Sequence, residues 1–175
     1  MSNPRRNKAC LSLGSNIEPE LNLPRAVELL KVYGDVRAVS AVWQSAPVGD
    51  TNQADFFNAA VLLETELSPT QLKRDGLQKI ETALNRVRDP KNKNAARTID
   101  LDLSLYNDEV FELEGRSIPD PDILKRPFVA VPLAELEPDY VHPVEQLTLR
   151  EIAERFNLSE WGMTRCDEIS LLRTN

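Results

Sequence analysis

The sequence predicts an α+β fold in which helices cover one face of an antiparallel sheet. Two observations support this prediction. Segments with strand-like and helix-like hydrophobic spacing follow one another in the order βαββαβ, ending near Tyr106. The chain of 175 residues is also long enough for one packed core and short for two. We therefore expect a single domain spanning residues 1–175.

The N-terminal segment begins with a strand and a helix. Residues 9–16, ACLSLGSN, form an apolar run that a glycine and an asparagine interrupt, which is typical of a buried strand followed by a turn. In residues 19–34, Leu23, Val27 and Leu30 recur at helical spacing, and the closing glycine provides a C-terminal stop. One helix therefore follows the first strand.

The middle of the chain predicts two further strands. Residues 35–49 alternate until a proline and a glycine break the pattern, and residues 55–67 are apolar enough for a central strand. The loop between them, residues 45–54, is longer than a hairpin requires, and such loops often hold binding groups. One face of the earlier strand is formed by Val36, Ala38, Ser40 and Val42.

The second helix, expected over residues 68–88, has the clearest start signal in the chain. Ser68 is a suitable N-cap, Pro69 fits the first helical position, and Gln71 completes a capping box. An apolar stripe along the predicted helix consists of Leu77, Ile80, Leu84 and Val87.

After a polar stretch, residues 89–96, comes a strictly alternating strand. Its inward residues are Ile99, Leu101, Leu103 and Leu105, and its outward residues are Thr98, Asp100, Asp102 and Ser104. The complete order βαββαβ matches the ferredoxin-like split unit, which places both helices on one face and leaves the other face open for a ligand. The remaining residues predict a C-terminal extension of short helices, two within residues 117–136 and one within residues 147–156.

Composition excludes several classes of protein. The formal net charge of −7 disfavours nucleic acid as a partner, because binding a phosphate backbone requires a basic surface. No window resembles a signal peptide or a membrane span, so we expect a cytoplasmic protein without membrane contact. Cys10 and Cys166 match no metal-binding spacing and are expected to be reduced thiols without a functional role.

Asp100 and Asp102 have the geometry of a metal site. Side chains two residues apart on a strand point to the same side, about 7 Å from each other, and two carboxylates at this spacing can hold a hard divalent cation. A solvated strand face can also carry two aspartates, and the pattern alone is weak. Its surroundings strengthen the interpretation, because five basic residues lie within twelve positions of an otherwise acidic chain: Arg86, Arg88, Lys91, Lys93 and Arg97.

Carboxylates, Mg²⁺ and an arginine-rich loop together indicate phosphoryl transfer, in which a protein positions groups and stabilises charge. The sequence contains no Walker A pattern, and Gly14 alone does not make a glycine-rich phosphate loop. His142, the only histidine, lies in a proline-containing turn and is expected to be structural rather than a catalytic base.

The segment ARTIDLDLSL resembles the signature of the 6-hydroxymethyl-7,8-dihydropterin pyrophosphokinase family. LSLGSN, SAPVG with DFFNAAV, IETALNRVR and RPFVAVPLAEL with VHP resemble its other blocks in the same order, so that the resemblance covers a core of about residues 9–155. The resemblance implies a ferredoxin-like fold and an enzyme of folate biosynthesis that uses two Mg²⁺ ions. The implied reaction transfers pyrophosphate from ATP to the hydroxymethyl group of the pterin and releases AMP. ATP and the dihydropterin are the implied partners.

The resemblance also implies a role for individual residues. Asp100 and Asp102 match the magnesium ligands, and Arg86 and Arg97 match the catalytic arginines. The matches on the ATP side are Glu81, Arg88, Asp120 and Arg126. The matches around the pterin are Ser45, Ala46, Pro47, Val48, Phe56, Asn58 and Phe128, of which the two phenylalanines stack on the ring.

Three positions depart from the family pattern. The loop of residues 89–96 lacks a tryptophan often present there and ends in two alanines, Asp120 replaces a common histidine, and Phe56 replaces the more usual tyrosine. Two alternatives therefore remain beside the enzyme: a non-catalytic relative that binds nucleotide or pterin, and a transferase for another pterin-like alcohol. The sequence is compatible with a monomer or a homodimer.

Overall fold

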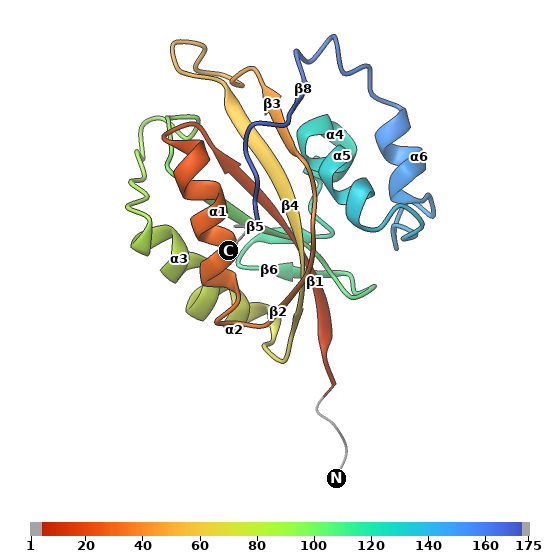
Figure 1. Cartoon of the computed structure of the whole chain (residues 1–175). Coiled ribbons are helices and arrows are strands. Elements are labelled where there is room, and N and C mark those ends of the chain that lie inside the picture. Colours follow the sequence, from red (N-terminus) through yellow and green to blue (C-terminus); the bar gives the residue numbers. More distant parts are fainter. Residues whose placement is uncertain (1–4, 173–175) are drawn as a thin grey trace.

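The computed structural model describes residues 5–172 and shows one antiparallel sheet with helices on both sides (Figure 1). Within these residues the sheet contains six strands, ordered β5-β1-β4-β3-β8, and β2 also pairs with β4. The strands are β1 (Asn7–Ser15), β2 (Asp35–Val39), β3 (Val42–Ser45), β4 (Phe56–Thr65), β5 (Asp100–Tyr106) and β8 (Thr164–Cys166). A separate hairpin consists of β6 (Phe111–Leu113) and β7 (Arg116–Ile118).

The helices form two groups. The first group lies on one face of the sheet and comprises α1 (Pro19–Leu30), α2 (Pro69–Gln71), the π-helical turn η1 (Leu72–Leu77) and α3 (Gln78–Ala83). The second group, beyond the other face, comprises α4 (Asp122–Lys125), α5 (Pro127–Leu136) and α6 (Leu149–Glu154). The predicted βαββαβ order is observed except that its second strand is divided into β2 and β3, and the three short C-terminal helices are confirmed.

The predicted strand over residues 35–49 is wrong in one respect, because it is split. The Ser40 amide donates to the Ala60 carbonyl, but the Ala60 amide donates to the Ser40 hydroxyl at 2.8 Å instead of to a backbone carbonyl. The side chain thus replaces a ladder hydrogen bond, and β2 and β3 become separate strands against β4.

The predicted helix over residues 68–88 is also corrected. Its capping box is confirmed, since Ser68 and Gln71 exchange side-chain and backbone hydrogen bonds. The helix contains the π-helical turn and ends at Ala83, because Asn85 adopts a left-handed conformation with a φ of 61°. Val87 therefore lies outside the apolar stripe and is 78% exposed.

The open face predicted for the sheet is largely covered. Side chains of α4, α5 and α6 pack on it and form a second buried cluster around Ile123, Leu133 and Ile152. Asp100 and Asp102, at one end of this face, border a cavity.

Leu105 does not share the inward face of the other β5 leucines. A β-bulge shifts the register with β1, so that Leu103 pairs with Leu11 but Leu105 pairs with Cys10. Leu105 therefore joins the second cluster, and Ser104, predicted outward, is fully buried. The Ser104 carbonyl accepts a hydrogen bond from the Asp120 amide at 2.9 Å, which ties the segment after β7 to the sheet edge.

No helix within residues 5–172 is long and apolar enough to cross a membrane.

Burial raises the pKa of the Cys10 thiol to about 12, so this cysteine remains a protonated core residue.

His142 has the predicted structural role, and its contacts predict a pH dependence. Its Nδ1 accepts hydrogen bonds from the amides of Val144 and Glu145 at 3.2 and 3.1 Å. Burial lowers the pKa of this imidazole from the ordinary value of 6.5. The unfolded chain therefore takes up the proton more readily, and the free energy of unfolding should decrease as the pH falls below about 6.5.

Urea unfolding at about pH 8 and about pH 5.5 checks this expectation. His142→Asn keeps an oxygen acceptor for the two amides but does not titrate, so the variant should lose less stability than the parent over this interval. An equal loss in both proteins would show that carboxylates elsewhere cause the acid sensitivity.

Candidate active site

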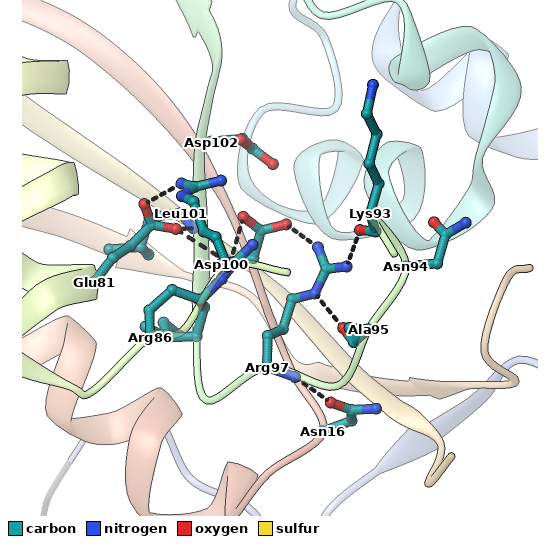
Figure 2. Close-up of polar contacts among 12 residues, drawn as sticks. Asn16, Glu81, Arg86, Lys93, Asn94, Ala95, Arg97, Asp100, Leu101 and Asp102 are labelled. Carbon is teal, nitrogen blue, oxygen red and sulfur yellow. Dashed lines mark hydrogen bonds and ion pairs between the residues drawn. The ribbon is translucent and has the colours of Figure 1, made fainter. Parts of the chain in front are cut away.

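The predicted carboxylate pair lies at the start of β5. Leu101 points into the core, so Asp100 and Asp102 on either side of it face the opposite way. Asp100 accepts from Arg86 Nη1 at 3.1 Å and from Arg97 Nη1 at 3.0 Å (Figure 2). Three predicted site residues from two segments thus meet at one carboxylate.

Asp102 is less fully neutralised than Asp100. Its closest cation is Arg116 on β7, with Nη1 at 3.5 Å from Oδ1. Burial and the like charge of Asp100 raise the pKa of Asp102 to about 7. A divalent cation held between the two carboxylates would favour the ionised form of Asp102. Because residues 5–172 contain no cluster of three metal-ligating side chains, substrate oxygens and water would supply the remaining ligands.

Arg97 is held in place by the loop that precedes β5. Its Nη2 donates to the Lys93 carbonyl at 2.7 Å, and its Nε donates to the Ala95 carbonyl at 3.2 Å. Its backbone amide donates to the Asn16 side chain at 2.8 Å, a contact from the turn after β1 (Figure 2). The guanidinium also lies 5.5 Å from the centre of the Phe56 ring.

Arg86 is oriented by a buried carboxylate on α3. Glu81 accepts from Arg86 Nη1 and from the Leu101 amide, both at 3.3 Å (Figure 2). It also accepts from Arg88 Nη2 at 3.1 Å. Burial, followed by the negative charge of Asp100, raises the pKa of Glu81. Arg86 also donates to the Ile99 carbonyl at 2.7 Å. The Arg86 guanidinium is therefore held by both Glu81 and the backbone before β5.

Two cavities meet at the carboxylate pair. Both are bordered by Arg97, Asp100, Asp102 and Arg116. The first cavity is partly aromatic and also contains Ser45, Ala46, Val48, Phe56, Asn58, Asp120, Arg126 and Phe128. The second cavity is more basic and also contains Lys73, Glu81, Arg86, Arg88 and Lys93.

The first cavity has polar groups along one wall. The Asn58 amide nitrogen donates to Ser45 Oγ at 2.9 Å, which leaves its Oδ1 next to Gly14 of β1. A Cβ atom added at Gly14 would lie 3.5 Å from this oxygen, an ordinary contact distance. Two aromatic walls and a fixed amide suit a flat, hydrogen-bonding heterocycle.

The predicted site residues are distributed over the two cavities as follows. Pro47 borders neither cavity, and Asp120 and Arg126, predicted on the ATP side, border the first cavity instead of the second. Asp120 is buried, accepts from Arg116 Nη2 at 2.7 Å and accepts from the Asp122 amide at 2.9 Å.

Several cavity residues were missed. Arg116 belongs to a hairpin that the sequence did not predict, and no local spacing marked it. The side chains of Ser12, Asn94 and Asp122 also border the first cavity. The polar composition of residues 89–96 was the only available signal for Asn94.

A carboxylate pair between a basic and an aromatic cavity is the arrangement expected of an enzyme that transfers a phosphate-containing group to an acceptor with a flat ring. Residues 10–138 match the family model described as 7,8-dihydro-6-hydroxymethylpterin-pyrophosphokinase (HPPK). The chain belongs to this family, as the sequence resemblance implied.

Two relatives carry the name 2-amino-4-hydroxy-6-hydroxymethyldihydropteridine pyrophosphokinase. The protein of Haemophilus influenzae is 38% identical over 151 residues, which are 85% of this chain and 92% of the relative. The protein of Bacillus subtilis is 41% identical over 133 residues, which are 74% of this chain and 78% of the relative.

Solved structures agree on the fold. The wild-type Plasmodium falciparum HPPK-DHPS with pterin and p-hydroxybenzoate superimposes with a TM-score of 0.73 at 16% identity. The match covers 94% of this chain and 46% of the other, so this chain spans about half the length of that protein. The predicted ferredoxin-like α+β class is confirmed.

Proposed function

We propose that this protein transfers the terminal pyrophosphoryl group of ATP to the hydroxymethyl oxygen of 6-hydroxymethyl-7,8-dihydropterin and releases AMP. The observation that carries the proposal is the position of Asp100, Asp102 and Arg97 on the border shared by the two cavities. A group transferred from one cavity to the other passes this border.

The first cavity suits the pterin. Phe56 and Phe128 provide ring faces, and Asn58 and the backbone of residues 45–48 provide hydrogen-bonding groups for the ring edge. The second cavity suits the triphosphate, whose charge Arg86 and Arg88 would balance. Asp120 and Arg126, on the first cavity, would contact the nucleotide only where the two cavities join.

Mg²⁺ bound by Asp100 and Asp102 would supply charge neutralisation for the transferring group, and we propose two ions, as the family resemblance implies. The protein groups would orient the reactants. Arg97, held by two loop carbonyls, would stay directed at the border between the cavities, and Glu81 would keep Arg86 aligned with Asp100. We further propose a single cytoplasmic domain that acts as a monomer or homodimer, without nucleic acid or membrane.

Product analysis tests this function. The protein is incubated with ATP, Mg²⁺ and the dihydropterin, and the nucleotides and pterins are separated by chromatography. AMP together with pterin diphosphate is the expected result. Binding of both ligands without turnover would instead indicate a non-catalytic relative, and turnover only with another pterin-like alcohol would indicate a different substrate.

A change of Phe56 tests the assignment of the pterin cavity. Phe56→Ala removes a ring face beside the ligand and the surface beneath the Arg97 guanidinium. We expect the KM for the pterin to rise roughly tenfold, because aromatic stacking contributes about 0.5–1.5 kcal/mol beyond burial. Phe56→Tyr retains the ring and should behave like the parent in steady-state kinetics. An unchanged KM in Phe56→Ala would place the pterin elsewhere.

A further inference from the structure

The C-terminal segment, residues 156–172, lies beyond the part of the chain that matches the family model. It leaves α6, passes the region of α4 and α5, and reaches the sheet edge as β8 beside β3 (Figure 1). Along this path the segment contacts residues of the first cavity at two places, near Phe128 and near Ala46.

Trp161 is the central contact of this segment. Its ring packs edge-on against Phe128, with centroids 6.3 Å apart and planes at 74°. The Arg126 guanidinium carbon lies 5.9 Å from the centre of the indole. Phe156 packs edge-on on the same ring at 6.2 Å and 85°, and it connects Trp161 to the second buried cluster. One side chain thus supports two neighbouring cavity residues.

The rest of the segment packs against β3 and the loop that follows it, which also border the first cavity. β8 pairs antiparallel with β3, with Thr164 opposite Gln44, the residue immediately before Ser45. Gly162 lies against the loop after β3, since a Cβ atom added there would be 3.9 Å from the Ala46 Cβ. The C-terminal segment therefore contacts the Arg126–Phe128 side of the cavity and the β3 loop on its other side.

We propose that Trp161 is a positioning residue for the transfer reaction, which holds Phe128 for the pterin and Arg126 for the phosphate side. This inference rests on the proposed function. Trp161 is only partly buried and belongs to neither buried hydrophobic cluster of the described residues. Its ring contacts are with cavity residues and with Phe156, which favours a role in the site over a role in general stability.

Three variants test the proposal. Trp161→Ala removes the ring, Trp161→Leu retains apolar volume without an aromatic face, and Trp161→Phe restores most of the ring. Each is compared with the parent in steady-state kinetics, in calorimetric binding of the dihydropterin and of a non-hydrolysable ATP analogue, and in thermal unfolding.

We expect Trp161→Ala and Trp161→Leu to raise the dissociation constant and KM for both ligands roughly three- to tenfold, since a ring pair and a cation–π contact are lost. The kcat should change by less than about threefold, and Trp161→Phe should recover most of the pterin affinity. The melting temperature of Trp161→Leu should stay close to that of the parent.

Unchanged affinities in Trp161→Leu, or a loss of stability with unchanged affinities, would overturn the proposal. The outcome for the parent protein separates this inference from the proposed function. If the parent converts the substrates and Trp161→Leu has the same affinities as the parent, only the role of Trp161 is contradicted. A parent that forms no pterin diphosphate contradicts the proposed function itself.

Discussion

Replacing both aspartates at the start of β5 is expected to abolish turnover. In Asp100→Asn/Asp102→Asn the side chains keep their size, but the site loses the charge with which it would hold Mg²⁺. We expect kcat to fall by at least about a thousandfold, because metal ions contribute several kcal/mol of transition-state stabilisation. Calorimetric titration of Mg²⁺ in the presence of the ATP analogue should show binding to the parent and little or none to the variant.

Asp108→Asn is the matched control for this pair. Asp108 follows the same strand, is exposed and lies outside both cavities. This variant should keep the kcat of the parent. Retained turnover in the double variant would contradict the assignment of Asp100 and Asp102 as metal ligands.

Replacing Arg97 is expected to cause the second large loss. Arg97→Ala removes the guanidinium beside Asp100 and should lower kcat by about a thousandfold, since an arginine at a transferring phosphate group contributes factors of 10³–10⁵. Steady-state kinetics under saturating ATP and pterin measures this change.

Two further variants make the result specific. Arg97→Lys keeps the charge but loses the planar fork that reaches Asp100 and the Lys93 carbonyl together, so most of the loss should remain. Arg25→Ala removes an exposed cation on α1 and should leave kcat unchanged. Full activity in Arg97→Lys would indicate that Arg97 acts only through its charge.

Local features of the sequence predicted the parts of the fold that depend on neighbouring residues. The capping box at Ser68 forms because its two partners are three residues apart. Asp100 and Asp102 share a side because alternation is a property of one strand. Leu105 was placed on the wrong face because the bulge is a feature of the pairing between β5 and β1, which the β5 pattern does not contain.

In the site, as in the fold, residues marked by a local sequence pattern were predicted and residues placed by distant contacts were not. Residues in recognisable blocks, such as Arg97 and Phe56, were found and lie together. Arg116 was missed because it reaches the cavity through a short hairpin, whose position depends on contacts distant in sequence. The contact of Trp161 with Phe128, which borders the cavity, likewise depends on the position of the C-terminal segment. Asp120, for which an ATP-side role stays a prediction, is held at the first cavity by its partner Arg116.

The most direct test of the proposed reaction locates the β-phosphorus of ATP after turnover. ATP labelled at this atom is incubated with the protein, Mg²⁺ and the dihydropterin, and the label is located after separation of the products. Transfer of a pyrophosphoryl group across the border between the two cavities predicts label in the pterin product and none in AMP. Label retained in ADP would mean that only the γ-phosphoryl group moves, and it would contradict the proposed reaction.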